Sequence, residues 1–365
     1  MKVVVKIGTS SITDEHGQID QAAIEKLSAE VAGLRGQRHS VIVVTSGAIA
    51  AGLPVLGLTT AARPVDVATL QAASAVGQSR LMSSYDAALG RHGLVAGQVL
   101  LAPLEVMNRS QYVLAQDTFR QLLHLGAVPV VNENDAVAVD EIRYGDNDHL
   151  AALVAHLVHA DLMVLLTDTT GLHSADPRVD LDASLIKEVV EFDHELDDVV
   201  VGGRGTLRGS GGMATKLRAA KIASWSGIRT VIAAADRPGV LAAAVAGDAG
   251  VGTVVRPRDR RLAARKLWIA FARRYQGVIE VDEGARRAMT ERETSLLAVG
   301  VVAVTGTFAA GDAVEIADKA GTVFAKGLVQ MGAEELRAVA GRRSADLPEG
   351  VAREVVHRDD LVVTA

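Results

Sequence analysis

The chain contains no cysteine, and only 3% of its 365 residues are aromatic. Without thiols it can form no disulfide, no thiolate metal site and no cysteine nucleophile. Hydrophobic residues nevertheless make up 49% of the chain. Its cores must therefore be built from alanine, valine, leucine and isoleucine, a balance that is typical of α/β proteins with buried parallel strands.

Several signals that would assign the chain to a common class are also missing. No uncharged apolar run reaches the ~20 residues that a membrane-spanning helix needs, and no targeting segment is visible. A net charge of -6 argues against a dedicated nucleic-acid-binding protein. No G-x-x-x-x-G-K-[ST] motif occurs, which excludes an ordinary P-loop enzyme. We expect a soluble, cytoplasmic protein without a membrane partner.

Short apolar runs alternate with helical patterns through the first two thirds of the chain. This alternation predicts an α/β fold with an open, mostly parallel sheet sandwiched by helices. We predict strands at 3–7, 41–45, 95–101, 128–131, 162–167 and 230–234. We predict helices near 22–34, 67–89, 111–125, 149–158 and 213–225.

The pattern changes after about Thr253, and the length of the chain also favours two domains. A basic stretch follows, and then short β-type runs between glycine-bearing turns, which indicate a small β-rich module. We expect a first domain over 1–255, a basic linker over 256–274, a β-rich domain over 275–353 and a carboxyl-terminal tail over 354–365.

Two lysines lie where an anionic partner is expected. Lys6 belongs to the first predicted strand, and a buried lysine needs an anion; the glycine and hydroxyls of 8–10 would suit a phosphate. Lys216 follows the glycines of 211–216 in the first turn of a predicted helix, where the dipole disfavours a cation unless an anion is bound. The alternatives are an edge strand whose Lys6 reaches water, and a flexible loop beside a surface lysine.

Two short clusters of amides and carboxylates suit a zwitterion, with carboxylates for an ammonium group and amides for a carboxylate. Asn-Glu-Asn-Asp at 132–135 follows a predicted strand, and ligands bind outside the carboxyl ends of strands in open α/β sheets. Gly-Asp-Asn-Asp at 145–148 precedes a helix. There, a helix cap and a favourable first-turn charge explain Asp146 and Asp148 more simply when each is taken alone.

Two further strand ends carry polar residues. Ser46 and Gly47 could offer backbone N–H groups to an anion, although a serine cap on the next helix is the simpler explanation. Asp168, after Thr167, could contact a nucleotide or a magnesium ion, with a turn aspartate as the alternative. The ten histidines show no spacing typical of metal ligands, so we expect no metal site built from protein side chains alone.

Taken in order, these motifs resemble the amino acid kinase family, in its branch that phosphorylates glutamate. The matching segments are 5–10, 44–52, 75–80, 131–135, 145–148, 166–168 and 211–216. Further on, 277–285 and 304–308 resemble a PUA domain. The resemblance implies the amino acid kinase fold and transfer of the γ-phosphoryl group of ATP to the side-chain carboxylate of glutamate, the first step of proline biosynthesis.

The resemblance also implies roles for individual residues. Lys6 and Lys216 would hold and neutralise the phosphates, and Asp148 would orient the two lysines. The residues implied in glutamate binding are Ser46, Gly47, Asn134, Asp135, Asp146 and Asn147. Those implied in ATP binding are Lys6, Thr167, Asp168, Ser210, Gly211, Gly212, Met213, Ala214, Thr215 and Lys216.

The expected chemistry needs few special groups. A glutamate carboxylate is already a nucleophile at pH 7, so no general base is required. ATP is the expected co-substrate, and Mg²⁺ would borrow its phosphates and water. The resemblance further implies inhibition by proline and a homo-oligomer, a dimer or a tetramer. PUA domains elsewhere bind RNA, but this one has few aromatics for base stacking, and its RNA binding stays open.

Two alternatives also stay open. A sister kinase acting on aspartate, acetylglutamate, carbamate or a nucleoside monophosphate would share most motifs, but the two amide–carboxylate clusters and the β-rich module favour free glutamate. An RNA-binding or regulatory protein could retain an inactive kinase fold. The presence of Lys6, Asp148 and Lys216 speaks against that reading.

Overall fold

The structure of the chain is a computed structural model. It describes residues 1–58, 64, 66–102, 109–137, 147–175, 180, 182–190, 212–259, 261–271, 275–348 and 350–364. The chain divides into two compact units, Met1–Arg261 and Leu262–Ala365. Within the described residues, no helix is both long enough and apolar enough to cross a membrane.

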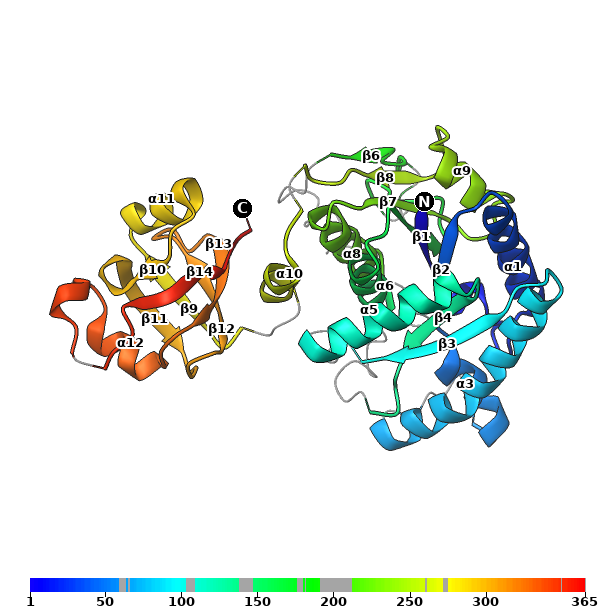
Figure 1. The fold of residues 1–365 in the computed structure, drawn as a ribbon, viewed down its shortest axis with the longest axis horizontal. Helices are drawn as coiled ribbons and strands as arrows, with labels where there is room; N and C mark the ends of the chain where they lie inside the picture. The colour runs from blue at the N-terminus through cyan, green and yellow to red at the C-terminus, as the bar shows by residue number, and fades with distance from the viewer. Residues whose placement is uncertain are drawn as a thin grey trace. The chain divides into compact units, whose positions relative to one another are not determined.

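The first unit is built on an eight-stranded sheet (Figure 1). Its strand order is β3-β4-β2-β1-β5-β7-β8-β6, and every pair is parallel except β7 with β8. The strands are β1 (Lys2–Ile7), β2 (Ser40–Val44), β3 (Ala96–Leu101), β4 (Val128–Glu133), β5 (Leu162–Thr167), β6 (Glu188–Val189), β7 (Arg229–Ala234) and β8 (Thr253–Val255).

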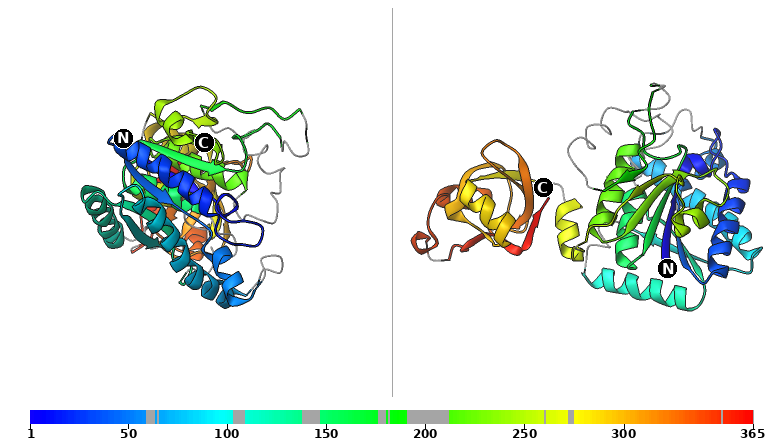
Figure 2. Two further views of the ribbon diagram at one scale, coloured as in Figure 1. Left: turned by 90° about the vertical axis from the view of Figure 1, so that its right-hand side faces the viewer. Right: turned by 90° about the horizontal axis from the view of Figure 1, so that it is seen from above.

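Helices cover both faces of this sheet, as Figure 2 shows. The first unit contains α1 (Gln21–Gly36), α2 (Ala48–Gly52), α3 (Val67–Gly90), α5 (Arg109–His124), α6 (Asn147–Leu157), α8 (Met213–Trp225) and α9 (Val240–Ala246). Helices α1, α3 and α9 share one core with alternate residues of β1, whereas α6 packs on α8 and on β1. The predicted α/β sandwich with a mostly parallel sheet is confirmed.

The central position of β1 explains its sequence. β1 pairs with β2 on one edge and β5 on the other, and helices cover both faces of the sheet, so Val3, Val4 and Val5 are fully buried. Side chains alternate along a strand, so Val3 and Val5 face the α1 side while Lys6 faces the opposite side. The alternative of an edge strand whose Lys6 reaches water is therefore wrong.

The second unit is a six-stranded sheet with two helices beside it and one before it. Its strand order is β10-β14-β13-β12-β9-β11, and only β9 and β12 pair in parallel. The strands are β9 (Gly277–Val281), β10 (Leu296–Leu297), β11 (Val301–Gly306), β12 (Ala313–Ala317), β13 (Val323–Val329) and β14 (Glu354–Val363). The helices are α10 (Ala264–Phe271), α11 (Glu283–Arg292) and α12 (Ala333–Val339).

Two segments of this unit differ from the sequence expectation. Residues 354–363, expected within a tail, form β14, which pairs with β10 and β13 and buries Val355 and Val356. The polar residues 357–360 interrupt the apolar alternation of β14, which hides the strand in the sequence. Part of the expected linker forms α10, which packs against β13 and β14.

Candidate active site

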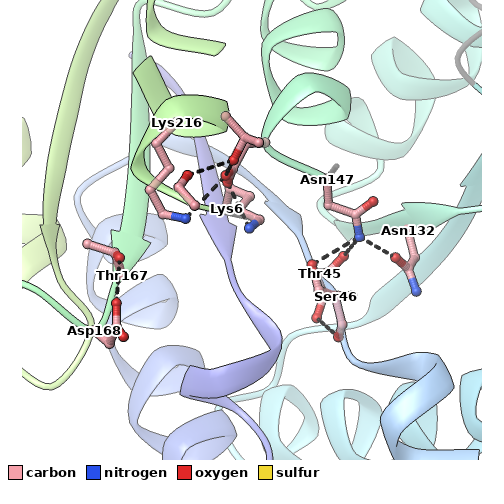
Figure 3. Close-up of polar contacts among 11 residues, drawn as sticks. Lys6, Thr45, Ser46, Asn132, Asn147, Thr167, Asp168 and Lys216 are labelled. Carbon is pink, nitrogen blue, oxygen red and sulfur yellow. Dashed lines mark hydrogen bonds and ion pairs between the residues drawn. The ribbon is translucent and has the colours of Figure 1, made fainter. Parts of the chain in front are cut away.

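The carboxyl ends of four neighbouring parallel strands carry the polar residues of the candidate site. In the sheet, β4, β2, β1 and β5 lie side by side, so the residues that end them gather at one edge. Figure 3 shows Lys6 at the end of β1, with the polar residues of β2 and β4 on one side and Thr167 with Asp168 on the other. The sequence expectation places the substrate and the nucleotide at this edge.

At the centre of the edge, one carboxylate is shared by two lysines. Lys6 Nζ lies 2.7 Å from Asp148 Oδ1, and Lys216 Nζ lies 3.2 Å from Asp148 Oδ2. Thr215 Oγ1 also donates to Asp148 Oδ2, at 2.8 Å. The structure thus brings together three residues that are far apart in the sequence, from β1, α6 and α8 (Figure 3).

The electrostatics of this group follow from its burial. Burial alone would raise the pKa of Asp148, but the positive charges of Lys6 and Lys216 and the hydrogen bonds of Lys6 and Thr215 lower it to about 2. The carboxylate is therefore ionised at neutral pH. It holds two ammonium groups side by side, and paired cations of this kind suit the phosphate groups of a nucleotide.

The start of α8 is the second element of this region. Gly212 is the N-cap and has no side chain with which to cap the helix, and the first turn contains no acidic residue. Lys216 belongs to that first turn and is only 6% exposed, so the alternative that it is a surface lysine is wrong. Backbone N–H groups at such a helix start favour anions. Ser210 and Gly211 lie outside the described residues.

A cluster of amide side chains occupies the other side of β1. Asn147 Nδ2 donates to Thr45 O at 2.6 Å, to Asn132 Oδ1 at 2.7 Å and to Ser46 Oγ at 3.1 Å (Figure 3). Asn132 Nδ2 donates in turn to Gln78 Oε1 at 2.8 Å. The backbone carbonyl of Thr45 can only accept, so it fixes the orientation of each amide along this chain.

The loop after β2 contributes Ser46 to this cluster, and Ser46 is not the N-cap of the helix that follows. Gly47, not Ser46, is the N-cap of α2, it has φ +98°, and among the described residues no side chain caps that helix. The positive φ requires glycine. The alternative that Ser46 caps the next helix is therefore wrong.

Three other residues were expected at the glutamate site, and the structure describes two of them, Asn134 and Asp135. Asp135 is 8% exposed, and its Oδ2 accepts a hydrogen bond from Ser74 Oγ at 2.6 Å. Asn134 is half-buried, and among the described residues only its backbone groups form hydrogen bonds, with Leu101 and Val137. Asp146 lies outside the described residues.

The expected nucleotide residues line the opposite side of β1. Thr167 Oγ1 donates to Asp168 Oδ1 at 3.0 Å, at the end of β5. Thr167 is buried, whereas Asp168 is exposed. Met213 and Ala214, at the start of α8, are partly buried against a small core that contains Leu217. Of these residues, Asp168 is therefore open to a ligand at the strand end.

Sequence reasoning assigned no role to Ser74, Gln78 or Thr45. Ser74 and Gln78 stand one turn apart in the middle of α3, and although Gln78 lies in the matching segment 75–80, the resemblance was not used to give either residue a role. One signal in the sequence could have indicated them. Ser74 and Gln78 are polar residues on a helix face whose neighbours, Ala73 and Gly77, are small, and all four residues are buried. Thr45 contributes through its backbone, which no sequence motif reveals.

Comparisons with known proteins agree with this architecture. The model of the amino acid kinase family matches residues 1–234, and the PUA domain model matches residues 277–351. The chain is 47% identical over 367 residues to a glutamate 5-kinase of Frankia casuarinae, covering 99% of this chain and 96% of that protein. It is 44% identical over 366 residues to a glutamate 5-kinase of Trichlorobacter lovleyi, covering 99% and 96%.

One solved structure is similar to this chain at the level of the fold. The carbamate kinase from Giardia lamblia bound to AMP-PNP superposes with a TM-score of 0.50 at 16% identity, covering 70% of this chain and 98% of that one. A likeness at this level of identity concerns the fold alone. The family model matches well over half of the chain, and relatives of this similarity span nearly all of it, so the chain belongs to the amino acid kinase family.

Proposed function

We propose that this chain is a glutamate 5-kinase. It transfers the γ-phosphoryl group of ATP to the side-chain carboxylate of L-glutamate, which gives L-glutamyl 5-phosphate and ADP, the first step of proline biosynthesis. Relatives that bear this name match the chain over almost its whole length. The observation that carries the proposal is the buried group of Lys6, Asp148 and Lys216 beside a separate cluster of amides.

Phosphoryl transfer requires positioning and charge stabilisation here, and no proton transfer. A carboxylate oxygen of glutamate attacks the γ-phosphorus, and the bond to the β–γ bridging oxygen breaks as ADP leaves. Lys6 and Lys216 hold the phosphate oxygens and offset their charge. With a pKa of about 2, Asp148 is a very weak base at neutral pH. Its proposed role is to position the two ammonium groups.

The amide cluster and Asp135 form the proposed glutamate site. In this proposal Asp135 binds the ammonium group of the substrate. Asn147, Ser46 and Gly47 contact the α-carboxylate of the substrate. Asn134 and Asp146 are neighbours of this site. This division is supported by the chemistry of the groups, because carboxylates attract an ammonium group and repel phosphates. The two halves of the site then lie on opposite sides of Lys6.

ATP is the co-substrate, and its proposed contacts are Thr167, Asp168 and the segment 210–216 at the start of α8. Across the part of the chain that the structure describes, no three His, Asp or Glu side chains are grouped to hold a metal. We propose that Mg²⁺ enters with the ATP phosphates and water, close to the exposed carboxylate of Asp168. Bound there, Mg²⁺ would neutralise charge on the β- and γ-phosphates.

The test is an ATP-dependent hydroxamate assay in which hydroxylamine traps the acyl phosphate. Glutamate, aspartate and acetylglutamate are compared as acceptors under the same conditions. We expect glutamate to be the preferred acceptor by a wide margin in kcat/KM. A preference for another acceptor would assign the chain to a sister kinase, and no acyl phosphate with any acceptor would favour an inactive kinase fold.

Regulation and assembly extend the proposal. Proline carries the same α-carboxylate and a charged amine, but it lacks the side-chain carboxylate, so it can occupy part of the glutamate site without accepting phosphate. We expect proline to inhibit in competition with glutamate, and inhibition that saturating glutamate leaves unrelieved would contradict a shared site.

The proposed location of the protein in the cell is the cytoplasm. The proposed homo-oligomer, a dimer or a tetramer, is tested by light scattering.

A further inference from the structure

The long helix α3 passes beside the proposed glutamate site and contributes two buried polar side chains to it. Ser74 Oγ donates to Asp135 Oδ2 at 2.6 Å, and one turn later Gln78 Oε1 accepts from Asn132 Nδ2 at 2.8 Å. Ser74 is 4% exposed and Gln78 is 8% exposed. One face of α3 therefore holds both ends of the Asn-Glu-Asn-Asp segment.

Ser74 differs from two other serines of α3 in the direction of its hydroxyl. Ser79 Oγ donates to Val76 O, and Ser83 Oγ donates to Ser79 O at 2.9 Å, which is the usual behaviour of serine within a helix. Ser74 instead donates to a residue 61 positions later in the chain. Its distance of 2.6 Å falls in the short range that is typical of an O–H donor to an ionised carboxylate.

From these contacts we infer that Ser74 is a positioning residue of the glutamate site. Its hydroxyl fixes the Asp135 carboxylate in the orientation that receives the substrate's ammonium group. The inference rests on the proposed function, in which Asp135 is that acceptor. A carboxylate already held on one oxygen loses less conformational freedom when the ammonium group binds, which strengthens binding.

The packing of α3 makes this contact rigid. Gly77 lies between Ser74 and Gln78 on the same buried face, and a Cβ atom there would lie 1.8 Å from Ala48 O in α2. A Cβ atom at Gly52 would meet α3 in the same way, 1.8 Å from Ala73 O. Helix α2 starts directly after Gly47, so this backbone contact sets the distance between α3 and the Ser46 loop.

The experiment compares Ser74→Ala with wild type in steady-state kinetics with both substrates. Without the hydroxyl of Ser74, the Asp135 side chain must be ordered when the ammonium group binds, so we expect KM for glutamate to rise roughly two- to tenfold. The values of kcat and of KM for ATP should stay within about twofold, because the Ser74 hydroxyl bonds to Asp135, whereas Asp148 holds the two lysines of the proposed phosphate site. Ser83→Ala is the matched control, since its hydroxyl bonds only within α3.

A double-mutant cycle separates positioning from general support of the fold. In the Asp135→Ala background, Ser74→Ala should have no further effect on KM for glutamate. An equal effect in both backgrounds, an unchanged KM in the single variant, or a parallel loss of kcat and ATP affinity would each overturn the inference. Absence of glutamate phosphorylation by the wild-type protein would instead reject the proposed function.

Discussion

Asp148 is the residue on which the candidate site depends most strongly. It is 1% exposed, and its two oxygens face the ammonium groups of Lys6 in β1 and Lys216 in α8. A buried carboxylate without cations would be protonated, and two buried lysines without a carboxylate would repel each other. The carboxylate and the two ammonium groups therefore stabilise one another, which is why we expect large effects of single substitutions.

The first prediction at this scale concerns the two lysines. We expect Lys6→Ala and Lys216→Ala each to lower kcat by roughly 10²–10³, the usual cost of removing one group that stabilises a transition state. Each purified variant should keep the circular dichroism spectrum of the wild type. Turnover close to the wild-type rate in either folded variant would contradict the role proposed for that lysine.

The second prediction concerns Asp148 and pH. Asp148→Asn keeps the shape but leaves two buried cations without their shared carboxylate, so we expect a loss of roughly 3–5 kcal/mol in the free energy of unfolding. The pKa of Asp148 falls from 3.8 to about 2 on folding, so its contribution is present above about pH 4 and disappears as pH falls toward 2.

The measurement is urea denaturation of both proteins between pH 7 and pH 2. The difference in stability between wild type and Asp148→Asn should be constant down to about pH 4 and then shrink. A difference that grows as the pH falls would have the wrong sign for a carboxylate with a lowered pKa.

At the scale of elements, the contact between α2 and α3 leads to the third prediction. In Gly77→Ala the new methyl group would overlap Ala48 O, and backbone at both sides must shift. We expect a loss of about 1–3 kcal/mol in stability, as for other overpacked sites, and a higher KM for glutamate because Ser74 and Gln78 move with α3.

The matched control is Gly33→Ala, in the interior of α1. A Cβ atom at Gly33 has nothing within 4 Å, and its backbone conformation is an ordinary helical one. Alanine should therefore stabilise the protein by roughly 0.5–1 kcal/mol and leave the kinetics unchanged. Equal melting temperatures of the Gly77→Ala and Gly33→Ala variants would show that the α2–α3 contact adapts without cost.

The elements also show what the sequence could and could not predict. Long periodic segments were predicted with their ends nearly in place, and the predicted helix at 213–225 is α8 itself. Helix α2 was not predicted, because its five residues are too few for a helical period. Strand β14 was missed because polar residues interrupt it. The contacts of Ser74 and Gln78 depend on tertiary packing, which local patterns do not encode.

At the scale of the whole molecule, the first unit contains every described residue of the candidate site. It ends at Arg261, and its last segment is tied to its own body, since Arg258 N donates to Ser224 O and the Arg258 guanidinium lies over the Trp225 ring. Helix α10 belongs to the second unit, where Leu267 and Ile269 are buried. The composition change after Thr253 located this division only approximately.

The position of the division leads to the fourth prediction, in which truncation after Arg261 leaves a folded kinase. This cut removes the second unit whole, and we expect kcat within a fewfold of the full chain.

A truncation after Arg273 is the sharper comparison, because it keeps α10 without the strands that pack against it. We expect that second protein to be less soluble, since α10 would lose its packing against β13 and β14. Solubility after expression, melting temperature and the hydroxamate assay compare the two directly. An insoluble or inactive product of the cut at Arg261, with an active product of the cut at Arg273, would mean that α10 supports the kinase unit instead.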